Sequence, residues 1–117
     1  MADTSGMVAR IWRGRTSARD ADVYSDYLHA EGVRKFAAIP GNLGAVMLRE
    51  DAGDEAEFIV ITYWRDRAAM AAYAGSDVTL TRHLPRDPEF LLALPERVTI
   101  HAVVAAEGSA VDQAGLT

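Results

Sequence analysis

The sequence contains no cysteine, only three histidines and a single lysine among its 117 residues. The absence of cysteine excludes disulfides, thiol chemistry and thiolate metal sites, and it agrees with a cytoplasmic location. The histidines lie far apart in the sequence and no metal-ligand motif is present, so we expect no metal site. No apolar run approaches the roughly 20 residues of a membrane-spanning helix, and the first six residues lack the apolar core of a secretory signal.

Charge and composition narrow the classes of function further. The formal net charge is −5, which argues against nucleic acid as a partner. Half of the residues are hydrophobic, enough for one core in a chain of single-domain length. We therefore predict one domain over residues 7–105, a disordered N-terminal segment over 1–6 and a flexible C-terminal tail over 106–117.

The segment from Glu57 to Tyr73 gives the strongest structural signal. Every residue from Phe58 to Trp64 is β-branched or aromatic, which is typical of a strand. Alternation places one apolar set on one face (Phe58, Val60, Thr62, Trp64) and a second on the other (Ile59, Ile61, Tyr63). We therefore expect a central strand that is covered on both sides. Asp66 and Gly75 are the predicted N-cap and stop of the helix that follows, over residues 67–74.

The other elements follow from periodicity and turn residues. Further strands are predicted over 7–13, 43–50 and 96–105, with a polar turn over 13–17. A helix over 18–38 carries an apolar stripe and is interrupted near Gly32. Turn and cap residues predict a turn at 40–42 and short helical turns over 78–81 and 89–93.

The resulting order is strand, helix, strand, strand, helix, strand. This order predicts an α+β, ferredoxin-like βαββαβ domain with a four-stranded antiparallel sheet. Both helices then cover one face of the sheet and leave the other face bare, although it is apolar. We therefore expect a homodimer that forms through the two sheet faces.

Four stretches together resemble the antibiotic biosynthesis monooxygenase family, within the dimeric α/β-barrel superfamily: Met7–Trp12, Pro40–Gly44, Glu57–Trp64 with its helix, and Val98–Val104. The resemblance covers about Met7 to Val104. It implies an oxygenase without a cofactor of its own, which uses O2 to oxidise a small phenolic or polycyclic aromatic ligand to a quinone. It also implies that Trp64, which matches the family's tryptophan at the end of the third strand, lines the substrate pocket.

Haem-degrading members of the family offer an alternative. They carry an asparagine on the first strand and, about three helical turns after the tryptophan, a histidine that ligates the haem iron. Here that helix ends in Tyr73-Ala74-Gly75, and the nearest histidine, His83, comes later. Haem binding through His83 is the second hypothesis, and a non-catalytic dimeric module that binds a small molecule is the third.

Six side chains are candidates for the site: Arg10, Trp12, Tyr24, Tyr27, Trp64 and His83. Arg10 interrupts an apolar strand, so it either meets a substrate phenolate or carboxylate or pairs with an acidic residue. His83 offers an imidazole as base or ligand, or is an ordinary exposed loop residue. The two tyrosines share the inner stripe of the first helix, and they, like Trp12, either contact the substrate or pack in the core or dimer interface.

Overall fold

Four antiparallel strands form one sheet in the computed structural model, which describes residues 4–108. Residues 1–3 of the predicted disordered segment and 109–117 of the predicted tail lie outside the described residues. The strands run in the spatial order β2-β3-β1-β4, with bounds β1 Val8–Ser17, β2 Asn42–Ala52, β3 Glu55–Trp64 and β4 Thr99–Ala102. This order confirms the predicted ferredoxin-like α+β fold and the central position of β3.

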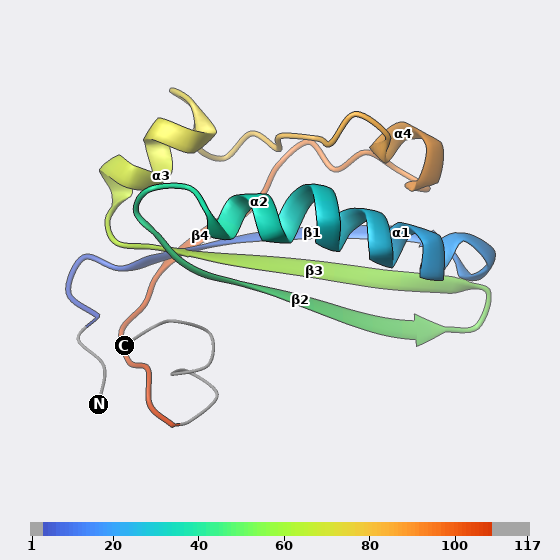
Figure 1. The fold of residues 1–117 in the computed structure, drawn as a ribbon, viewed down its shortest axis with the longest axis horizontal. Helices are drawn as coiled ribbons and strands as arrows, with labels where there is room; N and C mark the ends of the chain where they lie inside the picture. Colours follow the sequence, from blue (N-terminus) through green and yellow to red (C-terminus); the bar gives the residue numbers. More distant parts are fainter. Residues whose placement is uncertain (1–3, 109–117) are drawn as a thin grey trace.

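A continuous helical segment follows β1 and lies along the sheet (Figure 1). It consists of η1 Ala18–Asp20, α1 Ala21–Leu28, the π-helical η2 His29–Val33 and α2 Arg34–Ala37. The predicted interruption at Gly32 is wrong, because the chain continues there as a π-helix. A Cβ atom at Gly32 would lie 3.3 Å from the Cδ1 atoms of both Leu28 and Leu84. The glycine therefore lets the loop that carries Leu84 approach the helix closely.

Two shorter helices follow β3 and lie near opposite ends of the sheet: α3 Arg67–Ala74 and α4 Asp87–Phe90 (Figure 1). The bounds predicted for α3 are confirmed. The Asp66 carboxylate caps it by accepting a hydrogen bond of 2.8 Å from the amide of Ala69, which lowers the pKa of that carboxyl. Gly75 ends the helix at a φ of 92°, a conformation that favours glycine.

The helices cover one face of β3, where every second side chain from Ala56 to Trp64 is buried. Tyr24 of α1 packs edge-on against Phe58 with ring centroids 5.2 Å apart. On the opposite face Ile59, Ile61 and Tyr63 are only partly buried. Within the described chain, β3 is therefore covered fully on one side, and the expected homodimer through the second side stays a prediction.

One local prediction is wrong and another holds only in part. The polar residues 13–17 do not form a turn, because β1 continues through them in register with β3, up to the pair Ser17 and Glu55. A Cβ atom at Gly14 would lie 2.4 Å from the Trp12 ring, so this glycine makes room for the indole on the strand. The helical turn predicted over 78–81 is present only as a single turn, in which the Leu80 amide donates to the Asp77 carbonyl at 3.2 Å. It ends where Leu80 pairs in an isolated antiparallel bridge with Arg97.

Candidate functional site

One pocket lies between the sheet and the loop that joins α3 to α4, with a cavity volume of about 30 Å³ that opens to solvent. Ten residues line it: Arg10, Trp12, Leu28, Phe36, Val60, Thr62, Tyr73, Arg82, Leu84 and Asp87. Every major element except β2 and β4 contributes a lining residue. The pocket is therefore formed by the packing of the whole fold and not by one sequence motif.

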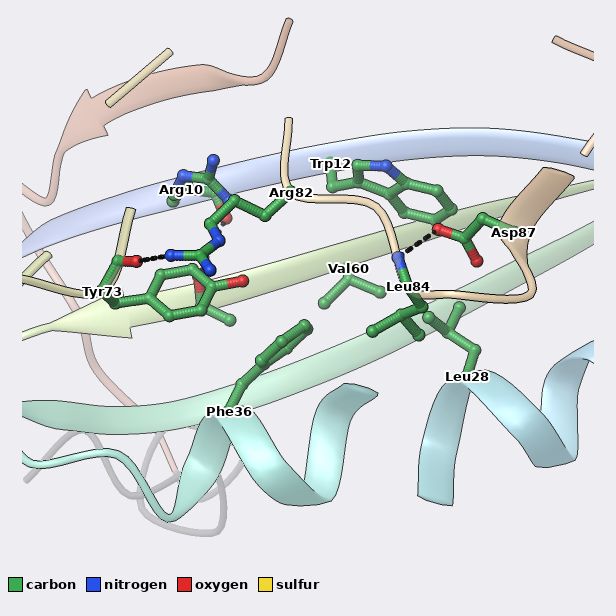
Figure 2. A pocket seen from close by; sticks show the side chains of 10 residues that line it. Arg10, Trp12, Leu28, Phe36, Val60, Tyr73, Arg82, Leu84 and Asp87 are labelled. Atoms are coloured by element: carbon green, nitrogen blue, oxygen red, sulfur yellow. Dashed lines mark hydrogen bonds between the residues drawn. The ribbon is translucent and has the colours of Figure 1, made fainter. Parts of the chain in front are cut away.

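The middle of the pocket is apolar and partly aromatic. Trp12 approaches from β1, Phe36 and Leu28 from the long helical segment, and Leu84 from the connecting loop (Figure 2). The Trp12 indole lies over Gly14, which has no side chain to push it away. Flat ring walls of this kind suit a planar aromatic ligand, because offset ring contacts add to the burial of apolar area.

One end of the pocket is cationic. Arg10 is 6% exposed and donates from Nε to the carbonyl of Val78 at 3.2 Å and from Nη2 to that of Leu80 at 2.6 Å. Burial lowers the pKa of Arg10, a change that Tyr73 partly opposes and Arg82 reinforces. The exposed Arg82 donates to the carbonyl of Tyr73. The two guanidinium carbons lie 5.6 and 5.3 Å from the Tyr73 ring centroid.

Tyr73 connects this end to the protein core. Its ring stacks on Trp64 at a centroid distance of 5.4 Å and an interplanar angle of 17°, and it meets Phe36 edge-on. Its hydroxyl points toward the middle of the pocket (Figure 2). Burial raises the pKa of Tyr73, and the two arginines only partly oppose this. The phenol therefore stays protonated at neutral pH and can donate a hydrogen bond to a ligand.

The other end of the pocket holds a buried acid, Asp87, which is 2% exposed. Its Oδ1 accepts a hydrogen bond from the Tyr24 hydroxyl at 2.9 Å, and its Oδ2 accepts one from the Leu84 amide at 2.9 Å. His83 Nδ1 lies 3.8 Å from Oδ2. Burial and then Asp87 raise the pKa of Tyr24. Both oxygens of this carboxylate are thus satisfied from within the protein.

The structure brings some of the predicted site residues together and separates others. Arg10 and Trp12 both line the pocket, as β-strand alternation places them on one face. Trp64 is fully buried behind Tyr73, and its Nε1 donates to the Thr62 hydroxyl at 2.9 Å. It therefore supports the wall without lining the pocket.

The remaining three predicted residues lie around the acidic end without lining the pocket. Tyr24 is fully buried beneath Asp87. The hydroxyl of Tyr27 accepts a hydrogen bond from the Arg86 amide at 2.9 Å. His83 lies between two lining residues, with 28% of its side chain exposed. Tyr24 thus positions the Asp87 carboxylate by a hydrogen bond, while Tyr27 anchors the segment that leads into α4.

Sequence reasoning missed Tyr73, Arg82 and Asp87. The pair Asp87-Pro88 predicts a helix cap, but the carboxylate turns inward to Leu84 and Tyr24 instead. The spacing of nine residues between Trp64 and Tyr73 was a usable signal for the stack, since the helix folds back over the strand end. No local pattern indicates that Arg82 returns to Arg10, because this contact depends on the path of a loop.

Metal and membrane criteria give negative results for the residues that the structure describes. Within residues 4–108 no group of three or more histidine, aspartate or glutamate side chains is arranged to hold a metal ion. No helix in this range is both long enough and apolar enough to cross a membrane.

Comparison with known proteins identifies a matching family and several similar structures. The model of the antibiotic biosynthesis monooxygenase family matches residues 20–83, more than half of the chain. No match was found among the curated proteins. A protein of unknown function from Nitrosomonas europaea is similar in structure, with a TM-score of 0.67 and 16% identity over 90% of this chain and 96% of that one.

Two similar structures carry names that state a function. SnoaB, a cofactor-independent oxygenase from Streptomyces nogalater, has a TM-score of 0.54 and 18% identity over 89% of this chain and 97% of its own. The heme-degrader MhuD from Mycobacterium tuberculosis, solved with two hemes in its active site, has a TM-score of 0.54 and 24% identity over 86% and 99%. At such low identities the likeness establishes the fold alone.

Proposed function

The chain belongs to the antibiotic biosynthesis monooxygenase family, and on this premise we propose that it oxidises a small phenolic or polycyclic aromatic compound with O2 and without a cofactor of its own. One observation carries the proposal. One partly enclosed pocket combines aromatic side chains in its walls with a buried arginine and a protonated tyrosine whose hydroxyl points inward. These groups suit an electron-rich ring whose oxygen becomes negative during the reaction.

The chemistry balances without a further reductant. A phenol that loses its proton can pass an electron to O2, combine with the resulting superoxide at the ring carbon, and then lose water. One oxygen atom enters the quinone and the other leaves as water, while the substrate supplies all four electrons. The protein would contribute orientation, exclusion of water from the ring, and cations that favour the phenolate.

In this proposal each residue has a defined part. Trp12 and Phe36 hold the ring, Arg10 stabilises the phenolate charge, and the Tyr73 hydroxyl donates to the same oxygen or to the developing peroxide. Trp64 is a positioning residue that fixes Tyr73 by stacking. The proton leaves to water at the open rim, and His83, which follows the rim residue Arg82 and has 28% of its side chain exposed, can serve as acceptor.

Haem is the alternative cofactor, and the described residues do not fit it well. No histidine lies among the residues that line the pocket, and the Nδ1 atom of His83 faces Asp87. Tyr73 is the lining side chain whose oxygen resembles a haem ligand. Burial raises its pKa, which opposes the tyrosinate form that binds iron. We therefore derive no step through haem.

A homodimer through the open sheet face completes the proposal. A second copy on this face would bury the partly exposed side chains of Ile59, Ile61 and Tyr63 from solvent. Burial of such a surface is typical of stable homodimers. Sedimentation velocity at micromolar concentration should give the mass of a dimer, and a monomer at that concentration would contradict this part of the proposal.

Oxygen uptake tests the reaction. Purified protein is mixed with 1-naphthol or anthrone, and O2 consumption and quinone formation are followed together. We expect one O2 consumed per quinone and, with labelled O2, one labelled atom in the product. Ligand binding without O2 uptake above the rate in buffer would overturn the oxygenase assignment and leave a binding module.

The Tyr73→Phe variant examines the proposed donor. It keeps the ring that stacks on Trp64 and removes only the hydroxyl, so the fold should persist. Loss of a donor aimed at developing charge typically lowers kcat by about 100-fold or more. Tyr63→Phe is the matched control, because Tyr63 precedes Trp64 on β3 but lies on the opposite face. Equal rates for both variants and the parent protein would remove Tyr73 from the mechanism.

A further inference from the structure

Arg10 and Arg82 differ from most arginines of the domain. Arg49, Arg86 and Arg97 each pair with a carboxylate at 2.9 Å or less. Within residues 4–108, by contrast, neither Arg10 nor Arg82 lies within 4.0 Å of an acidic side chain. Both face the same tyrosine ring at one end of the same pocket.

Two positive charges side by side without a counter-ion are unfavourable, most of all where one is buried. The acid of the pocket does not compensate them. Asp87 lies at the far end (Figure 2), and its two oxygens accept hydrogen bonds from the Tyr24 hydroxyl and the Leu84 amide. The arginine pair therefore has no counter-ion among the residues that the structure describes.

The donors that remain there fit a planar oxyanion. Arg10 uses Nε and Nη2 on carbonyl groups, and Arg82 uses Nη1. Arg10 Nη1, the other nitrogens of Arg82 and the Tyr73 hydroxyl carry no such hydrogen bond within residues 4–108. Charge-assisted hydrogen bonds from guanidinium groups are the preferred recognition of carboxylate-like oxygens.

We propose that this pocket selects aromatic ligands bearing an oxyanion, a carboxylate or a phenolate, which seats between Arg10 and Arg82 while the ring lies between Trp12 and Phe36. The inference rests on the proposed function only in taking this pocket as the ligand site. It adds a requirement for negative charge on the ligand, and it assigns Arg82 as a specificity-determining residue that carries that requirement at the rim.

Calorimetric titration of the full chain with three matched probes tests the proposal: 2-naphthoate, 2-naphthol and 2-naphthamide. They share one ring system and differ in the charge of the substituent. We expect 2-naphthoate to bind at least about tenfold more tightly than the neutral amide, since charge-assisted hydrogen bonds are roughly twice as strong as neutral ones. Affinity for 2-naphthoate should also fall as salt rises, because Arg82 is exposed.

The naphthol arm distinguishes the two sources of negative charge. Titration in two buffers with different enthalpies of ionisation reports whether a proton is released on binding. Proton release together with affinity above that of the amide identifies a phenolate site. Naphthol that binds like the amide, beside tight naphthoate, identifies a carboxylate site.

Two variants connect the preference to the arginine pair. Arg82→Gln should reduce the ratio of naphthoate to naphthamide affinity by about tenfold. Arg86→Gln is the matched control, since Arg86 belongs to the same segment and also lies over aromatic rings, at 5.5 Å from Tyr27 and 5.0 Å from Phe90. It does not line the pocket, so its ratio should equal that of the parent protein.

Equal affinity for all three probes, binding of none of them, or an unchanged ratio in Arg82→Gln would each overturn the inference. These outcomes are separate from a failure of the oxygenase proposal. Charge-selective binding without O2 uptake leaves the inference standing, whereas turnover of 1-naphthol at the same rate in Arg82→Gln and the parent protein leaves the oxygenase standing without the charge requirement.

Discussion

The two ends of the pocket treat charge in opposite ways. At one end Asp87 is almost fully buried, and each of its oxygens accepts a hydrogen bond from within the protein. At the other end Arg10 is equally well buried but bonds only to neutral carbonyl groups, beside a second cation. The acid is complete without a ligand, whereas the arginine pair is not.

This difference separates stability from function. A buried charge whose partners are all internal fixes the relative position of the elements that supply them, here α1, the connecting loop and α4. A buried charge without a counter-ion costs stability, and such unfavourable groups are found where binding or catalysis needs them. We therefore expect substitutions at the acidic end to weaken the fold and substitutions at the cationic end to weaken binding.

The largest effect should come from Asp87→Ala. It leaves the buried Tyr24 hydroxyl and the Leu84 amide without acceptors, and each unsatisfied group costs about 1–3 kcal/mol. We expect the free energy of unfolding, measured by urea titration, to fall by about 3 kcal/mol.

Tyr24→Phe is the graded comparison for that variant, because it removes one donor and keeps the carboxylate and its bond to Leu84. Its loss of unfolding free energy should be about half as large. A loss below about 0.5 kcal/mol in Asp87→Ala, the range of ordinary surface substitutions, would mean that the acid is not structural, and the contrast between the two ends would fail.

Much of the fold could be predicted from the sequence because its signals are local. Seven consecutive β-branched or aromatic residues predict β3, and the Asp66 cap with the Gly75 stop predicts the bounds of α3. The errors arise where tertiary contacts override local preference. Pairing with β3 carries β1 through the polar residues 13–17, and the helix continues past Gly32 as a π-helical turn against which Leu84 packs.

The site could be predicted only in part, for the same reason. Alternation along one strand suffices to place Arg10 beside Trp12. Tyr73, Arg82 and Asp87 reach the pocket from a helix, a loop and a helix start far along the chain, and their approach depends on long-range packing. Trp64 shows the converse: the tryptophan that the sequence predicts as the pocket wall lies one layer behind the pocket, where it supports Tyr73.

The smallest effect on stability should come from Arg10→Met, although Arg10 is as well buried as the core. Methionine keeps the unbranched apolar stem and removes the charge. The carbonyls of Val78 and Leu80 each lose a donor, but the cost of a buried cation beside Arg82 disappears with it. Replacing buried charge by an apolar side chain of similar shape is often close to neutral, so we expect the free energy of unfolding to change by less than about 1 kcal/mol.

Ligand binding, unlike stability, should be strongly reduced by the same substitution. We expect the affinity for 2-naphthoate to fall by about tenfold or more, as for the loss of one charge-assisted hydrogen bond, while affinity for 2-naphthamide is retained. Urea unfolding and calorimetry on the same preparation provide both values. A loss of about 3 kcal/mol with unchanged probe selectivity would show that Arg10 clamps the loop at residues 78–80. In that case the cationic end would be structural in the same sense as the acidic end, because hydrogen bonds to the two carbonyl groups would be enough to stabilise the buried guanidinium.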